Sequence, residues 1–395
     1  MSEITGTEIR QRIKNFQNIL MEEGLKGALI MQNVDLYYFT GTIQPSLLFI
    51  PVDGDASLMV LKNYDRVRNE SPLENILEIR TRNQALEFIL DSGIDPDARL
   101  GLETDVLPVN HYVWLMNEMP QCRWTDISAH IRRLRMIKSE YEIVQIKKAS
   151  AILHKGFTEI RGIIKKGMTE LEVDSHLGFI ARREGHMGLI RMRSWNQEMA
   201  YAHVLSGDSG SAASFVDSAH GGAGTTAAMA QGAGYRKIRK DEPILIDYGA
   251  AVNGYISDQT RTFVIGRLPR YMGKAFECSR KILDLLTKKA LPGVQAGDLY
   301  QAASDMAESN NLGKNFMGHG QAQVRFVGHG LGLEIDEYPV VGKNFNMPLQ
   351  EGMVIALEPK FVFPGQGAVG LEDDYVVTSS GLKRLTLTDQ ELVRL

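Results

Sequence analysis

Apolar residues recur along the first 130 positions with two alternating spacings. One set is spaced three or four residues apart, which predicts an amphipathic helix, and consists of Ile9, Ile13, Phe16 and Leu20. The continuous apolar run 25–31 follows and predicts a buried strand. Segments 46–52 and 56–61 flank the turn pair Asp53-Gly54, which predicts a β-hairpin. Because helical and strand-like segments keep alternating, residues 1–136 are expected to form an α/β domain.

A second pattern begins near residue 137. Ser139 and Glu142 form a capping box that opens a long amphipathic helix. Its apolar face continues to Ile164, and the lysines and glycine at 165–167 are expected to end it, since cations and glycine are typical of helix C-termini. Residues 137–395 are therefore expected to form a second domain.

The stretch 205–234 is rich in glycine, alanine and serine and has no clear period. This composition favours a flexible surface loop without chemistry. The alternative is a loop that lines a substrate site, because the stretch lies between two structured halves.

Composition limits the chemistry that is available. The chain has 395 residues, of which 44% are hydrophobic and 23% charged, and a formal net charge of -4, which is typical of a globular protein. There is no basic stripe for nucleic acid and no run of 18 apolar residues for a membrane span. Cys122 and Cys278 are the only cysteines, so a metal must be held by oxygen and imidazole. These features indicate a cytoplasmic protein.

Two acidic hairpins carry the strongest chemical signal. Asp247 and Asp258 lie almost symmetrically about the turn pair Asn253-Gly254, so an antiparallel hairpin is expected to bring them opposite each other on one face. Like charges that face each other repel, and a cation between them would remove that cost. Thr260 and Arg261 follow, and they are expected to orient carboxylates; a surface ion pair is the alternative for Arg261.

The second hairpin repeats this arrangement. Glu358 and Glu372 are equidistant from Gly365, which lies in the turn-forming segment 364–367. All four carboxylates lie in apolar, strand-forming sequence, where an unpaired anion would be costly to bury. A solvated strand face would explain one acidic pair, but two symmetric pairs in apolar strands favour a metal site.

His329 is a candidate fifth ligand, because flanking glycines let the backbone approach closely. Four carboxylates and a neutral imidazole carry four negative charges, which balance two divalent ions. Two ions about 3.5–4 Å apart would share a water and supply hydroxide near neutral pH, which predicts hydrolysis at a carbonyl. Oxygen-rich ligands favour manganese, with cobalt, zinc or iron as alternatives. Scattered side chains, or acids paired with a lysine or arginine that leaves no room for ions, would contradict this interpretation.

At these residues the sequence resembles the M24 metallopeptidase family, which includes prolidase, Xaa-Pro aminopeptidase and methionine aminopeptidase. The matching motifs are IDYG with DQTRTF, GHGLGLEIDEYP, ALEP and GLEDDYVV, in the family's order and with its short intervals. NVDLYYFTG and IRRLRMIKSEYEIVQIKKA resemble a segment of the creatinase-type N-terminal domain and the entry into the catalytic domain.

The resemblance implies a fold and an assembly. Residues 1–136 would form a creatinase-like α/β N-terminal domain, and residues 137–395 an α+β pita-bread catalytic domain. A homodimer is implied, in which the N-terminal domain of one subunit borders the site of its partner.

The resemblance also implies a role for each candidate ligand. Asp247 and Asp258 would bind one metal, and His329 the other. Asp258 and Glu372 would bridge the two ions. Glu358 would both bind metal and handle the proton of the attacking water.

Three departures from the proline-peptidase pattern concern the substrate side. Ala230 stands where the family usually has a histidine, Asp336 stands at a second histidine position, and Val340 stands at an arginine position. His220 could replace a missing catalytic histidine, although an exposed loop histidine is the simpler interpretation. Asp336 could bind a substrate amine, or could hydrogen-bond a metal ligand.

Three functions remain open from the sequence. The first is a dinuclear metal-dependent hydrolase that cleaves a peptide or peptide-like amide bond, as an Xaa-Pro dipeptidase or aminopeptidase would. The second is the same metal centre acting on a non-peptide amide or as a lyase. The third is a non-catalytic binding protein on the pita-bread scaffold, which the retention of all five candidate ligands disfavours.

Overall fold

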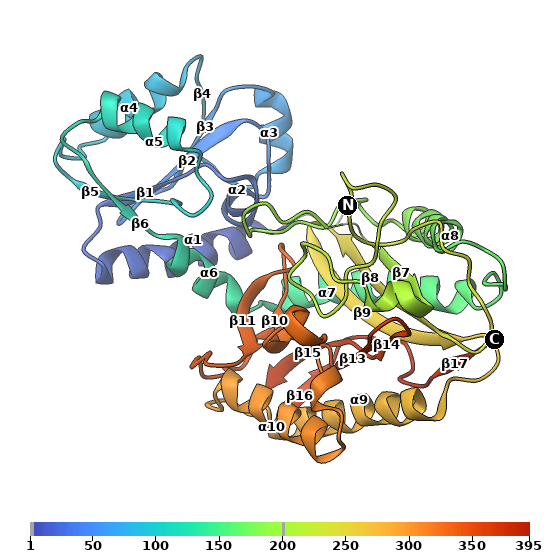
Figure 1. Cartoon of the computed structure of the whole chain (residues 1–395). Coiled ribbons are helices and arrows are strands. Elements are labelled where there is room, and N and C mark those ends of the chain that lie inside the picture. Colours follow the sequence, from blue (N-terminus) through green and yellow to red (C-terminus); the bar gives the residue numbers. More distant parts are fainter. Residues whose placement is uncertain (1–3, 200–201) are drawn as a thin grey trace. The chain divides into compact units, whose positions relative to one another are not determined.

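The chain divides into two compact units, Met1–Arg135 and Met136–Leu395. The computed structural model describes residues 4–199 and 202–395 (Figure 1). Each unit has its own hydrophobic core. Within these described ranges, no helix is long and apolar enough to cross a membrane.

The first unit is a six-stranded mixed sheet with helices on both faces (Figure 1). In the strand order β4-β3-β2-β1-β5-β6, the bounds are β1 Gly27–Ile30, β2 Ser46–Pro51, β3 Ser57–Val60, β4 Ile76–Glu78, β5 Arg99–Leu102 and β6 Arg123–Asp126. The helices are α1 Gly6–Glu22, α2 Asn33–Thr40, α3 Tyr64–Glu70, α4 Arg82–Asp91, α5 Val109–Glu118 and α6 Ser128–Met136. The predicted first helix, the buried strand and the β2–β3 hairpin are confirmed.

The second unit contains two larger sheets and a separate hairpin. One sheet has the order β17-β9-β8-β7, with β7 Ala202–Ser206, β8 Pro243–Val252, β9 Tyr255–Val264 and β17 Val393–Arg394. The other has the order β11-β10-β12-β15-β16, with β10 Phe326–Gly330, β11 Glu337–Gly342, β12 Val354–Leu357, β15 Asp373–Thr378 and β16 Gly381–Arg384. The hairpin is formed by β13 Lys360–Phe363 and β14 Gly367–Gly370.

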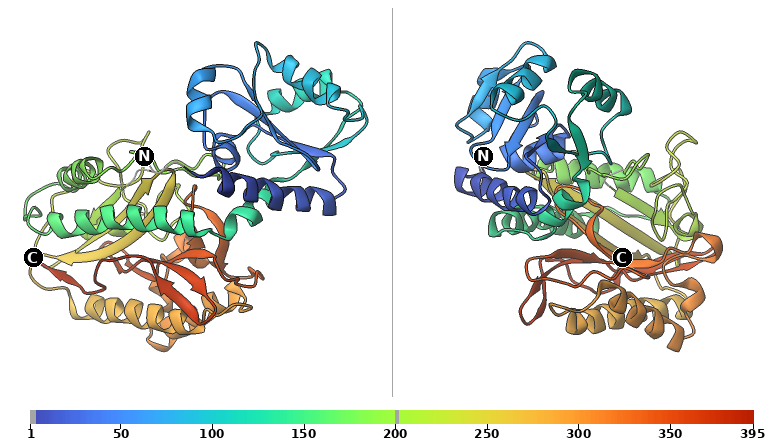
Figure 2. Two further views of the ribbon diagram at one scale, coloured as in Figure 1. Left: turned by 180° about the vertical axis from the view of Figure 1, so that it is seen from behind. Right: turned by 90° about the vertical axis from the view of Figure 1, so that its left-hand side faces the viewer.

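Helices cover the outer faces of these two sheets (Figure 2). The long helices are α7 Glu140–Ile160, α8 Glu170–Arg183, α9 Arg270–Lys289 and α10 Ala296–Ser309, and the short 3-10 turns are η1 Gly207–Ser211, η2 Gly313–Asn315 and η3 Gly320–Ala322. One core lies between α7, α8 and the four-stranded sheet, and another between α9, α10 and the five-stranded sheet. The strands between these layers carry the candidate site.

Helix α7 begins as predicted but ends earlier. Ser139 and Glu142 form the capping box at its start. The helix stops at Ile160, before the 165–167 segment that was expected to end it. The backbone N–H groups of Ile163 and Ile164 both bond to the carbonyl of Ile160, so the chain tightens into a turn that keeps Ile164 in the core.

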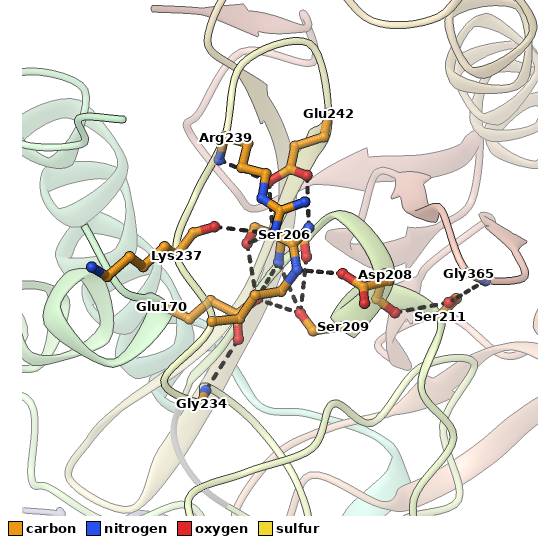
Figure 3. Close-up of polar contacts among 11 residues, drawn as sticks. Glu170, Ser206, Asp208, Ser209, Ser211, Gly234, Lys237, Arg239, Glu242 and Gly365 are labelled. Carbon is orange, nitrogen blue, oxygen red and sulfur yellow. Dashed lines mark hydrogen bonds and ion pairs between the residues drawn. The ribbon is translucent and has the colours of Figure 1, made fainter. Parts of the chain in front are cut away.

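The 205–234 stretch is not the loose surface loop that its composition favoured. Glu170 of α8 accepts hydrogen bonds from the backbone N–H of Ser206 at 2.6 Å and of Gly234 at 3.1 Å, near the two ends of the stretch (Figure 3). Arg236 then joins Glu242 and Ser206. A buried carboxylate with several backbone donors is a strong anchor, so both ends of the stretch are fixed in the second unit.

Candidate metal centre

The five candidate ligands lie together in the second unit, although they come from different strands. Asp247 lies in β8, Asp258 in β9 and His329 in β10, while Glu358 directly follows β12 and Glu372 directly precedes β15. All four carboxylates are buried. The His329 Nε2 atom lies 3.8 Å from Glu358 Oε1 and 3.7 Å from Glu372 Oε1. Three acids from two sheets, Asp258, Glu358 and Glu372, therefore lie around one imidazole.

The first hairpin has a register that differs from the symmetric expectation. Asp247 pairs with Thr260, and Asp258 pairs with Gly249. The two aspartates are thus diagonal neighbours rather than directly opposite, although they share one face of the sheet because side chains alternate. The reason is that Val252 pairs with Tyr255 across the turn, so the centre of the hairpin lies one residue beyond the midpoint of the two aspartates.

The second hairpin has the predicted symmetry. Lys360 pairs with Gly370 at the open end of β13 and β14, and Gly365 lies in the turn with a φ of 69°. Glu358 lies two residues before Lys360, and Glu372 lies two residues after Gly370. The hairpin therefore places Glu358 and Glu372 next to each other.

Lys360 is the residue that sequence reasoning missed. Its Nζ atom lies 3.0 Å from Asp247 Oδ2, 2.8 Å from Glu358 Oε2 and 2.9 Å from Glu372 Oε2. The side chain is buried, and an ammonium has three N–H donors, so each donor has one carboxylate acceptor. The sequence contained a signal, because Lys360 follows Glu358 by two residues and strand side chains two apart share a face.

The ammonium changes the charge balance of the centre. Four carboxylates with one lysine carry three negative charges, where the acids alone would carry four. Burial raises the pKa of Asp247, but Lys360 and His220 outweigh burial and hold that pKa well below its usual range. Burial, Glu372 and Asp247 together raise the pKa of Asp258 well above its usual value, so Asp258 lacks comparable compensation.

Part of the centre fits a metal ion. Asp258, His329 and Glu372 each offer a ligand atom, and these atoms lie within 4.8 Å of one another. Asp258 Oδ1 and Glu372 Oε1 are buried without a hydrogen-bond partner. Burial lowers the pKa of His329, but the nearby negative charges of Glu372, Glu358 and Asp258 outweigh burial and raise this pKa to about 10. Oxygen and imidazole ligands of this kind suit a divalent ion.

Residues behind the ligands hold them in place. The Thr260 hydroxyl donates to Glu372 Oε2 at 2.8 Å. Arg261 is fully buried, donates to the carbonyl of Glu372 at 2.7 Å, and forms an ion pair with Asp373 at 2.6 Å. Arg261 is therefore a buried anchor, and the alternative of a surface ion pair is wrong.

Two histidines lie on the far side of Asp247. His220 is buried, not exposed, and its Nε2 atom lies 3.2 Å from Asp247 Oδ2. His203, which sequence reasoning missed, pairs with Asp247 across β7 and β8, and its Nε2 atom lies 3.1 Å from Gln231 Oε1. His203, His220 and Asp247 form a second group with metal-ligand geometry. Burial and Lys360 lower the pKa of His220 to about 4, so this histidine is neutral at pH 7.

The three substrate-side departures lie in different settings. Asp336 accepts hydrogen bonds from the backbone N–H groups of Arg193 and Ser194, each at 2.9 Å, and these contacts hold the neighbouring loop. Neither bond involves a metal ligand, so Asp336 supports a loop here. Val340 pairs with His329 across β10 and β11, and Ala230 precedes Gln231, whose amide faces His203.

Comparison with known proteins identifies relatives of both units. The model of Metallopeptidase family M24 matches residues 144–379, and that of the Creatinase/Prolidase N-terminal domain matches residues 12–137. An Xaa-Pro dipeptidase of Pyrococcus furiosus is 26% identical over 98% of this chain and 100% of its own length. A peptidase of Staphylococcus epidermidis is 29% identical over 95% of this chain and 98% of its own.

Solved structures agree with these relatives. A dipeptidase from Pyrococcus horikoshii has a TM-score of 0.78 at 29% identity, over 97% of this chain and 100% of its own. A prolidase from the same organism has a TM-score of 0.81 at 25% identity, over 97% and 100% of the two chains. The two-domain arrangement of creatinase-type and pita-bread folds predicted from the motifs is confirmed.

Proposed function

The chain belongs to metallopeptidase family M24, and from this premise we propose that it hydrolyses Xaa-Pro peptide bonds with a divalent metal ion. The relatives named above, an Xaa-Pro dipeptidase and a prolidase, support this substrate class. The observation that carries the proposal is a group of three buried carboxylates, Asp258, Glu358 and Glu372, around His329, with oxygens of Asp258 and Glu372 left unpartnered.

The donor atoms of the centre suggest a role for each residue. Asp258, His329 and Glu372 would hold metal, with Asp247 and Glu358 beside them. The bound ion supplies Lewis-acid chemistry and a water of lowered pKa. Burial raises the pKa of Glu358 above its usual value, so its carboxylate is suited to accept the proton of the attacking water and to return it to the departing nitrogen.

The identity of the metal, the assembly and the location belong to the same proposal. Family membership implies a dinuclear centre, and the oxygen-rich ligand set favours manganese over cobalt, zinc or iron. We expect a homodimer, as the resemblance implies. Both cysteines are free and buried, which is compatible with the cytoplasm.

A second candidate function keeps the centre and changes the substrate. Ala230, Asp336 and Val340 replace groups that proline peptidases use, and Asp336 is occupied with the 193–194 backbone. A non-peptide amide, or an elimination catalysed at the same centre, would need none of those groups. The metal would still be required.

The experiment is an assay of Xaa-Pro dipeptides and longer Xaa-Pro peptides with added Mn²⁺ or Co²⁺. The proposal predicts metal-dependent release of proline-containing product, and a loss of at least about 10²-fold in Glu358→Gln, in line with removal of a general base. Absence of metal-dependent cleavage across the panel, in protein that binds metal, would favour the second candidate. Equal activity in Glu358→Gln would contradict the role of this carboxylate.

A further inference from the structure

Lys360 lies among the acids as a bound cation would. Its ammonium contacts one oxygen from each of three carboxylates, Asp247, Glu358 and Glu372, at 2.8 to 3.0 Å. Charge-assisted hydrogen bonds of this length are strong, and all three donors are used. A divalent ion would need the same oxygens at roughly 2.0–2.2 Å, so ammonium and ion compete for one position.

The chain makes room for this lysine. The aliphatic part of the Lys360 side chain packs against Gly370, its partner in the hairpin. A Cβ added at Gly370 would lie 2.7 Å from Lys360 Cγ and 2.8 Å from Lys360 Cα. Only glycine permits that approach. The lysine is thus built into the β13–β14 hairpin, and its placement does not depend on a mobile surface chain.

The remaining ligand atoms do not contact the ammonium. Asp258 Oδ1 and Glu372 Oε1 have no hydrogen-bond partner, and one ligand atom each from Asp258, Glu372 and His329 lie within 4.8 Å of one another. Glu358 Oε1 also faces this imidazole, at 3.8 Å. These atoms are available to one divalent ion while Lys360 keeps its three contacts.

We propose that the Lys360 ammonium takes the place of one of the two divalent ions, so that the centre binds a single ion at Asp258, His329 and Glu372. The inference rests on the proposed function only for the premise that the centre binds metal. With one ion, the formal charge of the four carboxylates, the lysine and the metal is one negative charge. The ammonium also fixes Glu358 and Asp247 without a second ion.

The group of His203, His220 and Asp247 is a weaker place for a second ion. Asp247 is its one carboxylate, and the Oδ2 atom is already bonded to Lys360. The Lys360 ammonium, 3.0 Å from Asp247 Oδ2, repels a cation there. At His329, by contrast, Glu358 Oε1 and Glu372 Oε1 lie 3.8 and 3.7 Å from Nε2, and these oxygens favour a cation beside the imidazole.

The test is a count of bound manganese. Full-length protein is stripped with chelator, saturated with Mn²⁺ alone, freed of unbound ion and analysed for metal per chain. Wild type should hold one equivalent, and Lys360→Ala, which frees three carboxylate oxygens, should hold two. Lys383→Ala, at an exposed position in β16, is the control and should hold one.

A magnetic measurement gives a second readout. Mn²⁺ bound to wild type should give the electron paramagnetic resonance signal of an isolated ion, and Lys360→Ala that of two coupled ions. Two equivalents in wild type would overturn the inference, and this count needs no variant to fold. One equivalent in folded Lys360→Ala would overturn it as well. If wild type binds two ions and cleaves Xaa-Pro peptides, the single-ion inference is wrong and the proposed function stands. If wild type binds no ion, the single-ion inference and the proposed function are both wrong.

Discussion

At the scale of single residues, the hydroxyl of Thr260 fixes the position of Glu372. It donates to Glu372 Oε2, the same oxygen that Lys360 contacts, and so leaves Oε1 directed at His329. Groups that orient a metal ligand in this way commonly contribute 10-fold to 100-fold to metal affinity. Loss of this hydroxyl should therefore weaken metal binding and leave the fold intact.

Thr260→Val should weaken Mn²⁺ binding by about 10-fold to 100-fold, measured by calorimetric titration of the metal-free protein. Thr262→Val is the matched control, because Thr262 is also a buried threonine of β9 but donates to the carbonyl of Gly370 at 2.8 Å. The control should lose about 1 kcal/mol of stability and keep its metal affinity. Equal losses of affinity in both variants would contradict the role given to Thr260.

Asp174 lies in α8, outside the metal centre, and its ionisation lowers the stability of the folded protein. Burial raises its pKa to about 6, from an ordinary value near 3.8. A raised pKa means that the folded state disfavours the ionised form, so stability falls as the pH rises from about 4 to 6 and stays lower above that range.

Asp174→Asn should therefore raise the free energy of unfolding at pH 8 by about 1–3 kcal/mol and change it little at pH 4. Denaturant unfolding at the two pH values measures the difference. Asp284→Asn, on the exposed side of α9, should give the same small change at both values. A gain for Asp174→Asn that is equal at pH 4 and pH 8 would show that ionisation is not the cause.

Single residues also show what the sequence could and could not reveal. The four acids could be identified because they flank turns in apolar strands, and alternation then assigns them to common faces. Lys360 lies only two positions from Glu358, but a protonated lysine is not a metal ligand, so a pattern of acids and histidines does not include it. His203 could not be placed, because its partner Asp247 is assigned by the β7–β8 register between distant segments.

At the scale of elements, the β13–β14 hairpin requires a glycine at position 370, where this residue pairs with Lys360. An added methyl at Gly370 would meet the stem and backbone of Lys360 and the carbonyl of Pro359. Gly273, in the first turn of α9, is the opposite case, because nothing lies within 4 Å of an added Cβ. The two glycines therefore predict opposite effects of the same substitution.

Gly370→Ala should destabilise the protein by about 1–3 kcal/mol, because a crowded core must shift. Gly273→Ala should stabilise it by about 0.5–1 kcal/mol, because alanine favours the helix and reduces the freedom of the unfolded chain. Chemical denaturation of both variants beside wild type measures the two signs. Stabilisation by Gly370→Ala would contradict the close approach of Lys360.

Elements with strong local signals were predictable, and those with weak signals were not. Capping boxes located the start of α7, and turn pairs located the hairpins. The end of α7 was misplaced, because a 3-10-like turn continues the apolar spacing past Ile160. The 205–234 stretch was misjudged because Glu170, a residue distant in sequence, anchors both of its ends.

At the scale of the whole molecule, both units have counterparts in the family, and all five candidate ligands lie in the second unit. We expect the chain to assemble as a homodimer. Sedimentation equilibrium should give twice the mass of the 44.0 kDa chain. A monomer at micromolar concentration would contradict the assembly and leave the chemistry of the centre untouched.

The most direct test of the central claim is restoration of activity in metal-free protein. Chelator-treated enzyme should not cleave an Xaa-Pro dipeptide, and stepwise addition of Mn²⁺ should restore cleavage in proportion to bound metal. Replacement of Asp258 by Asn should weaken Mn²⁺ binding and activity together, because this carboxylate has no ammonium partner. Full cleavage in the absence of metal, or undiminished Mn²⁺ binding in the Asp258→Asn protein, would contradict the account.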